Sequence, residues 1–227
     1  MEHHETSVIS IDQMPRKERE FLRRQQDILT AARNLFGGAD WQQVTVEQIA
    51  REAEIGKGTV YKHFASKEAI YANIAISFHE SLLTKFQQIS LTQPIDRVMH
   101  AIIRTSFDLF LAHPAEARIS HYCKRGDFLE GLDSQLQAQF LNLEGRFNEY
   151  IYQVLDIGID QGVIPKRPHD QLVVGLEATF DGALFMIWNG QVNHLSHMQQ
   201  NEFVDVISEF MLAGLLGLPK HLSENRT

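Results

Sequence analysis

The chain has 227 residues, a single cysteine and a formal net charge of −8 at neutral pH. With 44% hydrophobic and 22% charged residues it is long enough to bury a core, which excludes a disordered or fibrous chain. The lone cysteine excludes a disulfide framework, and the first residues lack the apolar core of a secretory signal, so we expect a cytoplasmic protein.

Charge is distributed unevenly along the chain. Residues 14–67 carry ten Lys and Arg against seven Asp and Glu, a net of +3, whereas the rest carries eleven against twenty-two, a net of −11. A basic N-terminal quarter on an acidic chain is typical of a nucleic-acid-binding domain joined to a domain with another role. Such a small excess is also common on solvated surfaces.

The N-terminal part begins with residues 1–15, which show no sustained periodicity and are expected to form a flexible tail. Apolar residues then recur every seven positions, at Phe21, Ile28 and Leu35. This spacing predicts an amphipathic helix, and Gly37 is expected to end it.

Three further helices are predicted next. Thr45 and Gln48 have the spacing of a T-x-x-Q capping box, so a second helix is expected to start at Thr45 and to end near Ala53. A short third helix is expected over residues 56–63, and a fourth over residues 66–90, capped by the serine at its start. The apolar residues expected on the buried side of the fourth helix are Ile70, Ile74, Phe78, Leu82 and Ile89.

The rest of the chain is also expected to be helical. The apolar stretch 172–188 is short for a membrane span and contains Glu177 and Asp181, so it predicts a helix buried on all sides and no membrane insertion. No strand-like alternation appears, so the predicted fold is all-α, with a small N-terminal unit and a larger helical bundle. The other helices are expected to begin at Pro94 and Pro114 and to cover residues 129–161, 170–188 and 199–216.

The second and third predicted helices are joined by a turn of two or three residues, which is the geometry of a helix-turn-helix. The third helix is too short to bury much surface, and Val60 and Phe64 are its apolar anchors. Its remaining side chains are mostly polar or basic and suit contacts with phosphates and base edges. They are Lys57, Thr59, Tyr61, Lys62 and His63.

Three stretches carry a resemblance to a known family: V-T-V-E-Q-I-A-R-E-A at residues 44–53, G-K-G-T-V-Y-K-H-F at 56–64, and S-K-E at 66–68. They resemble the TetR family of one-component transcriptional regulators. The resemblance implies a helix-turn-helix DNA-binding domain over residues 16–68, with the fourth helix as a link. It also implies a helical ligand-binding and dimerisation domain over residues 69–227.

The resemblance also implies DNA contacts for individual residues. Lys57, Thr59 and Lys62 would face the major groove, while the other members of the set would contact phosphate or bases. A lysine in the first turn of a helix opposes the helix dipole by about 0.3–1 kcal/mol, which makes sense if it helps to hold a phosphate. The implied DNA-binding residues are Thr45, Lys57, Gly58, Thr59, Tyr61, Lys62, His63 and Lys67.

Alternative interpretations remain open for four of these residues. In these interpretations, Lys67 is a solvated lysine and Tyr61 is a half-buried core residue. His63 is then a solvated or capping histidine, and Thr45 is simply a helix cap. Ahead of the first helix core, a cluster of Arg and Lys either reaches phosphates or the minor groove or is a solvated helix start. The cluster comprises Arg16, Lys17, Arg19, Arg23 and Arg24.

Two positions depart from the family pattern. Glu54 stands where glycine is usual in the turn, and a left-handed conformation there costs a non-glycine residue on the order of 1 kcal/mol. Gly56 stands where the recognition helix usually opens with serine, which removes one hydroxyl from the expected phosphate contacts.

In the TetR family the C-terminal helices form a pocket for a small molecule and a dimer interface. Aromatic side chains on the middle helices are candidates for a hydrophobic pocket, with plain core packing as the alternative. Glu177 and Asp181 are one helical turn apart and either attract a cationic ligand or bind partner helices. The pocket candidates are Phe107, Phe110, Tyr122, Phe128, Phe147, Tyr150, Glu177 and Phe180, and the dimer candidates are Phe185, Trp188, Phe203 and Phe210.

The sequence therefore predicts a transcriptional repressor that binds a palindromic operator in double-stranded DNA as a homodimer and is released by a hydrophobic small molecule. An enzyme is not expected, because no phosphate-binding loop, nucleophile elbow or H-E-x-x-H motif is present, and no cofactor is implied. Cys123, beside Lys124, is a candidate redox sensor, and His194 with His197 is a metal pair that lacks further ligands. The rival class is a helical adaptor that keeps the fold without binding operator DNA.

Overall fold

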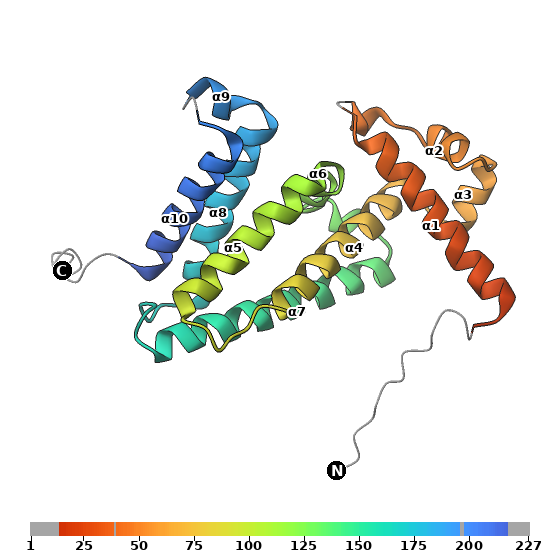
Figure 1. The fold of residues 1–227 in the computed structure, drawn as a ribbon. Helices are drawn as coiled ribbons and strands as arrows, with labels where there is room; N and C mark the ends of the chain where they lie inside the picture. Colours follow the sequence, from red (N-terminus) through yellow and green to blue (C-terminus); the bar gives the residue numbers. More distant parts are fainter. Residues whose placement is uncertain (1–13, 39, 196–197, 218–227) are drawn as a thin grey trace, which may run out of the picture. The chain divides into compact units, whose positions relative to one another are not determined.

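A computed structural model describes residues 14–38, 40–195 and 198–217 of the chain. All regular secondary structure in these residues is helical, so the prediction of an all-α fold is confirmed. The chain divides into two compact units (Figure 1). The N-terminal unit comprises the chain up to Phe78 together with His113–Gln139, and the C-terminal unit comprises His79–Ala112 and the chain from Phe140 onward.

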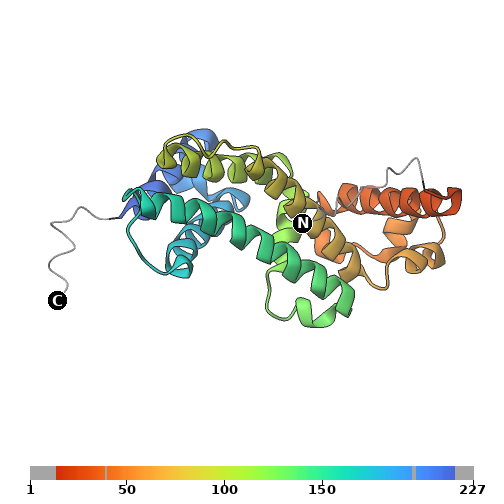
Figure 2. The ribbon, with the colours of Figure 1, turned by 90° about the horizontal axis from the view of Figure 1, so that it is seen from below.

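The N-terminal unit is built around α1, Arg16–Phe36, which packs beside α2, Val46–Glu52 (Figures 1 and 2). The buried side of α1 begins at Ile28 and ends at Phe36. Phe21 belongs to the same predicted apolar stripe but is exposed, because the first three turns of α1 extend beyond the core. The unit also contains the 3-10 helix η2, Trp41–Gln43, α3, Lys57–His63, α6, Pro114–Cys123, and the 3-10 helix η3, Leu129–Gly131.

Two helices that link the units start at side-chain caps. In α4, Lys67–Gln87, the backbone N–H of Ala69 donates to Ser66 Oγ at 3.1 Å, as the predicted cap requires. The predicted end of α4 at residue 90 is wrong: the helix stops at Gln87, so Ile89 lies outside it. The four other apolar residues predicted on the buried side of α4 are buried.

The start of α7, Ser134–Asp160, also differs from the prediction of a helix from residue 129. The carboxylate of Asp133 accepts hydrogen bonds from the backbone N–H groups of Gln135 and Leu136, at 3.0 and 2.9 Å. These bonds satisfy free donors of the first turn and fix the helix start there. Gly162, with φ of 69°, lies just after the other end, as the predicted stop requires.

The C-terminal unit contains α5, Ile95–Ala112, α8, His169–Trp188, α9, Gln191–Leu195, and α10, Gln200–Leu216. In Figure 1, α8 and α10 lie side by side, and α10 also packs on α5. The sequence predicted all of these helices except α9.

In the single chain α8 is buried on one side only, so its burial on all sides stays a prediction that requires a partner chain. Leu172, Ala183 and Leu184 are buried, but Val174 is exposed and the Phe185 side chain is 57% exposed. By length and composition α8 is apolar enough to cross a membrane, a test that core helices of soluble proteins also pass. Its packing against α10 places it in the helical bundle instead.

Gly158 of α7 tests how tightly the C-terminal unit is packed. A Cβ atom at this position would lie 2.5 Å from Cδ1 and 2.8 Å from Cγ1 of Ile164, and 3.1 Å from Cγ1 of Ile95. We expect Gly158→Ala to lower the free energy of unfolding by about 1–3 kcal/mol, because overpacking outweighs the gain in helix propensity. Urea unfolding measures this difference.

Gly145 is the matched control, since it lies on the same helix and a Cβ there would meet no atom within 4 Å. Gly145→Ala should raise the free energy of unfolding by about 0.5–1 kcal/mol through helix propensity alone. A gain of stability in both variants would contradict the close approach at Gly158.

Candidate nucleic-acid interface

The N-terminus of α2 has the predicted capping box. The backbone N–H of Gln48 donates to Thr45 Oγ1 at 3.3 Å, and the backbone N–H of Thr45 donates to Gln48 Oε1 at 2.7 Å. Both bonds satisfy donors that a helix start leaves free, so the capping role of Thr45 is confirmed. Its side chain is still exposed, so capping leaves room for the predicted phosphate contact.

The turn between α2 and α3 passes through Glu54, whose φ is 54°. This value lies in the left-handed region, which is costly for any residue with a Cβ atom. Glu54 is also the position at which the sequence departs from the glycine that is usual in the family. The backbone N–H of Ile55 donates to Ala50 O at 2.9 Å across the turn, so the chain reverses tightly after α2. The turn is therefore the two-helix connection that the sequence predicted.

Helix α3 has one apolar and one polar side. The side chains of Val60 and Phe64 are only 1% and 4% exposed, so they anchor the helix as predicted. Its other side faces solvent, because Lys57, Tyr61 and Lys62 are exposed. Gly58 is exposed with them and Thr59 is part-buried. A short helix held by two buried residues thus presents a continuous row of polar and basic groups.

Lys57 has a partner that sequence reasoning missed. Its Nζ forms an ion pair with the carboxylate of Glu47 on α2, and it lies 5.8 Å from the centroid of the Tyr61 ring. The hydrogen bond to Lys57 lowers the pKa of Glu47, and the same bond raises the pKa of Lys57. The two residues are ten positions apart, so only the tight turn between their helices would have indicated the contact.

Lys67 occupies a different setting from the one predicted. Its Nζ donates to the backbone carbonyls of Gln42, at 2.8 Å, and Val44, at 3.2 Å, and lies 5.5 Å from the centroid of the Tyr71 ring. The ammonium group therefore ties the start of α4 to the segment that precedes α2. Two of its three N–H donors are engaged, which leaves one for the predicted phosphate contact.

His63, at the end of α3, packs against α1. Its ring lies on Phe21 with a centroid distance of 4.2 Å, and its Nδ1 atom is buried without a hydrogen-bond partner. Burial lowers the pKa of His63, and the nearby charges of Arg24 and Lys62 lower this pKa further. Both effects favour the uncharged form of the ring, and its other nitrogen is left for the predicted phosphate contact.

The basic cluster at the start of α1 is helical rather than extended. Arg16 forms an exposed ion pair with Glu20 at 2.8 Å, and Arg24 forms one with Asp27 at 3.4 Å. Exposed pairs one turn apart are typical of a solvated helix and contribute little to stability. A reach into the minor groove remains a prediction for this cluster.

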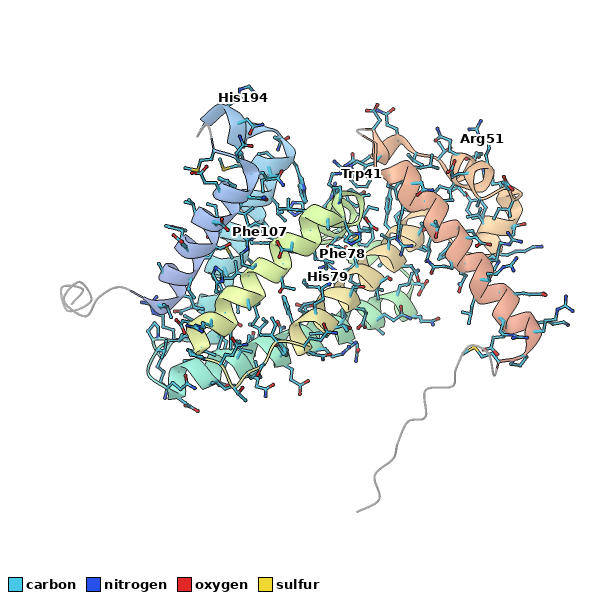
Figure 3. The ribbon with its side chains drawn as sticks, in the orientation of Figure 1. Trp41, Arg51, Phe78, His79, Phe107 and His194 are labelled. Atoms are coloured by element: carbon cyan, nitrogen blue, oxygen red, sulfur yellow. The ribbon has the colours of Figure 1, made fainter. Side chains whose placement is uncertain are left out.

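The aromatic residues predicted to line one pocket are divided between the two units. Those in the C-terminal unit form one network, because the His79 ring lies 6.4 Å from that of Phe110 and 5.8 Å from that of Phe147. In the C-terminal unit, the Phe180 ring lies 4.7 Å from that of Phe107, which Figure 3 labels, and 5.0 Å from that of Phe110. In the same unit, Phe86 lies 6.0 Å from Phe147 and 5.9 Å from Tyr150. These distances are those of packed aromatic cores.

Tyr122 and Phe128 belong to the N-terminal unit instead, with 5.8 Å between their ring centroids. Tyr122 also packs against Trp41, at 5.5 Å, and Tyr71, at 5.7 Å. Glu177 is exposed on α8 in the single chain and Asp181 is part-buried, so the two carboxylates do not form a buried pair there.

Other sequence candidates are corrected or left open. Burial raises the pKa of the Cys123 thiol, which is the opposite of the activation expected beside Lys124 and argues against the redox-sensor hypothesis. His194 lies on α9 (Figure 3), whereas His197 lies outside the described residues. In the part of the chain that is described, no group of three or more His, Cys, Asp and Glu side chains is arranged to hold a metal.

The tight turn between α2 and α3, together with the polar side of α3, defines a helix-turn-helix domain. Residues 28–74 match the family described as bacterial regulatory proteins of the tetR family. Over these residues the chain has the N-terminal domain of the tetR family, which supports a regulator of that family.

Curated relatives match with low identity. The regulator HbdR of Aromatoleum sp. (strain CIB) is 30% identical over 83 residues, which cover 35% of this chain and 35% of HbdR. SrpR of Pseudomonas putida is 28% identical over 66% of this chain and 68% of its own length. KstR2 of Rhodococcus jostii (strain RHA1), a transcriptional repressor by name, is 28% identical over 61% of this chain and 67% of its own length.

Solved structures share the fold over most of the chain. A TetR-family regulator from Syntrophomonas wolfei has a TM-score of 0.66 at 20% identity and covers 88% of this chain and 98% of its own. LfrR from Mycobacterium smegmatis, solved in complex with proflavine, has a TM-score of 0.58 at 20% identity, with coverage of 87% and 99%.

The contacts of Lys67 lead to a stability prediction. We expect Lys67→Met to lower the free energy of unfolding by roughly 1 kcal/mol, because two carbonyl groups lose a charged donor. Chemical denaturation measures the change, and Lys166→Met, at an exposed loop position, is the control that should stay within about 0.5 kcal/mol of wild type. Unchanged stability in Lys67→Met would contradict the structural role of this ammonium group.

Proposed function

We propose that the protein is a repressor that binds a palindromic DNA operator as a homodimer and is released by a small hydrophobic molecule. The observation that carries the proposal is the exposed polar side of α3, which is fixed by the buried Val60 and Phe64. A helix that is short, anchored and basic on its free side suits insertion into the major groove. The repressor name of KstR2 agrees with this direction of control.

Within this proposal the DNA contacts divide into two kinds. Lys57, Thr59 and Lys62 read base edges in the major groove, and Gly58 lets the backbone approach closely. Tyr61 and Thr45 contact phosphates, and the remaining N–H donors of His63 and Lys67 contact phosphates as well. Phosphate contacts fix the register of the protein, whereas base contacts select the sequence. Residues 16–68 are the proposed DNA-binding domain, and residues 69–227 the proposed ligand-binding and dimerisation domain.

The proposed dimer forms through α8 and α10. Both helices expose large apolar side chains in the single chain, with Phe185 57% and Phe210 65% exposed, next to the exposed Val174 and Val206. An apolar surface of this kind is costly in water and is buried when a second copy covers it. A twofold dimer matches a palindromic operator with half-sites about one helical turn apart.

Two other dimer candidates have different settings. Phe203 is only 6% exposed and is buried in its own chain, so it has little surface left for a partner and we remove it from the proposed interface. Trp188, at the end of α8, is part-buried and stays in the proposal.

The proposed ligand is a hydrophobic molecule bound in the C-terminal unit. The cluster of Phe107, Phe110 and Phe180 supplies aromatic surface on α5 and α8. LfrR, which shares the fold, was solved with the aromatic compound proflavine. By linkage, a ligand that weakens operator binding must itself bind less tightly when DNA is present. We also propose that the protein is cytoplasmic and has no enzymatic activity. The alternative function is that of a helical adaptor that does not bind operator DNA.

DNA binding is tested by fluorescence anisotropy with the duplex upstream of the protein's own gene and with duplexes recovered by random-sequence selection. Wild type should bind one of them with a steep dependence on salt concentration, because released counterions drive the association. The double variant Tyr61→Ala, Lys62→Ala should bind at least about tenfold more weakly, because it loses a base contact and a phosphate contact.

The control is Lys166→Ala, which removes one positive charge from an exposed loop outside the helix-turn-helix and should leave the affinity unchanged. If folded wild type recovers no DNA site in the selection, the proposal of operator binding is rejected in favour of the helical adaptor.

The dimer is tested by sedimentation equilibrium. Phe210→Glu should shift the protein from dimer to monomer, because it places a charge in the centre of the proposed apolar interface. Leu141→Glu is the matched control, since Leu141 on α7 is equally exposed but lies outside α8 and α10. A wild-type monomer, or a dimer that both variants retain, would contradict the proposed interface.

A further inference from the structure

The proposed DNA-reading surface contains an acidic residue in direct contact with a basic one. Glu47, in the first turn of α2, forms an ion pair with Lys57, in the first turn of α3. Both side chains are about half exposed, so the pair lies on the surface rather than in the core. A carboxylate at this place repels DNA phosphates, so it lowers the affinity of the surface for DNA in general.

The pair restricts where the Lys57 ammonium group can go. A free lysine side chain is a flexible point charge that can move to whichever phosphate is near. Here the Glu47 carboxylate holds the ammonium on one side, and the Tyr61 ring lies 5.8 Å from it. Tyr61 is one helical turn after Lys57 on α3, so both contacts hold the side chain at the exposed side of that helix.

We propose that Glu47 is a positioning residue that determines DNA specificity: it holds Lys57 for a base edge and keeps it from binding arbitrary phosphates. This inference rests on the proposed function, since it assumes that α3 enters the major groove. The base edge that fits a held ammonium group is guanine, whose N7 and O6 atoms both accept hydrogen bonds in that groove. Glu47 thus lowers affinity for arbitrary DNA and preserves affinity for the operator.

The alternative is that the pair serves folding. An exposed ion pair contributes little to stability, because water screens it and two long side chains lose freedom to form it. Removal of the Glu47 charge is therefore expected to change DNA selectivity while the unfolding midpoint stays the same. This difference separates a positioning role from a structural one.

The experiment compares two duplexes of equal length: one recovered by random-sequence selection with wild type, and one with the same bases in shuffled order. Anisotropy across a salt series gives the affinity and the salt slope for each. Glu47→Gln should bind the shuffled duplex several-fold more tightly, with a slope steeper by about 1, since Lys57 now neutralises a phosphate. The ratio of operator to shuffled affinity should fall by roughly tenfold.

Two further variants separate positioning from net charge. Glu52→Gln removes the same charge from an exposed site at the other end of α2 and should leave the ratio unchanged. In a Lys57→Ala background, Glu47→Gln should no longer change the ratio or the slope, because no ammonium remains to be positioned.

Three outcomes overturn the proposal: an unchanged ratio in Glu47→Gln, an equal change in Glu52→Gln, or an effect of Glu47→Gln that persists without Lys57. The last two would show that general repulsion of phosphates is the cause. If the selection with wild type recovers no duplex, the proposed function fails. Operator binding with an unchanged ratio in Glu47→Gln rejects the role of Glu47 alone.

Discussion

The burial of Val60 and Phe64 is the constraint on which the rest of the N-terminal unit depends. Helix α3 has seven residues, and isolated helices shorter than about 12–15 residues are marginal in water. Its stability must therefore come from the buried side chains of Val60, within the helix, and Phe64, directly after it. Because Val60 takes the buried side of the helix, the other side is left to polar and basic groups. A reading surface follows from this division, and α1 and α2 provide the support behind it.

The sequence predicted those parts of the fold that short-range chemistry decides. The capping box of Thr45, the cap at Ser66 and the stop at Gly162 each depend on a few neighbouring residues, and all three were confirmed. Errors arose where a distant or competing group decides the outcome. The helix predicted from residue 129 starts at Ser134 because the Asp133 carboxylate caps it. For α8 the prediction of burial on all sides stays open, because one of its sides is exposed in the single chain. Hydrophobicity shows that a surface avoids water but not which chain covers it.

The same limit applies to the candidate site. The exposed polar side of α3 followed from its composition, but the partners of its residues did not. Lys67 reaches carbonyls at residues 42 and 44, and His63 packs on Phe21, more than forty positions away. Such contacts depend on how helices pack, which local patterns do not encode. Glu47 was missed because acidic residues in the first turn of a helix already have a sufficient explanation in the helix dipole.

These partners share one physical effect, which is to reduce the freedom of groups around α3. Lys67 fixes the segment ahead of α2, the His63–Phe21 contact fixes the end of α3, and Glu47 restrains Lys57. A chain with a net charge of −8 has little general attraction for DNA, so its affinity must come from a few well-placed contacts. Groups that are held before binding lose less entropy when they bind. Under the proposed function, preorganisation of the cations by carbonyl, aromatic and carboxylate neighbours would allow an acidic protein to favour one DNA sequence over other phosphates.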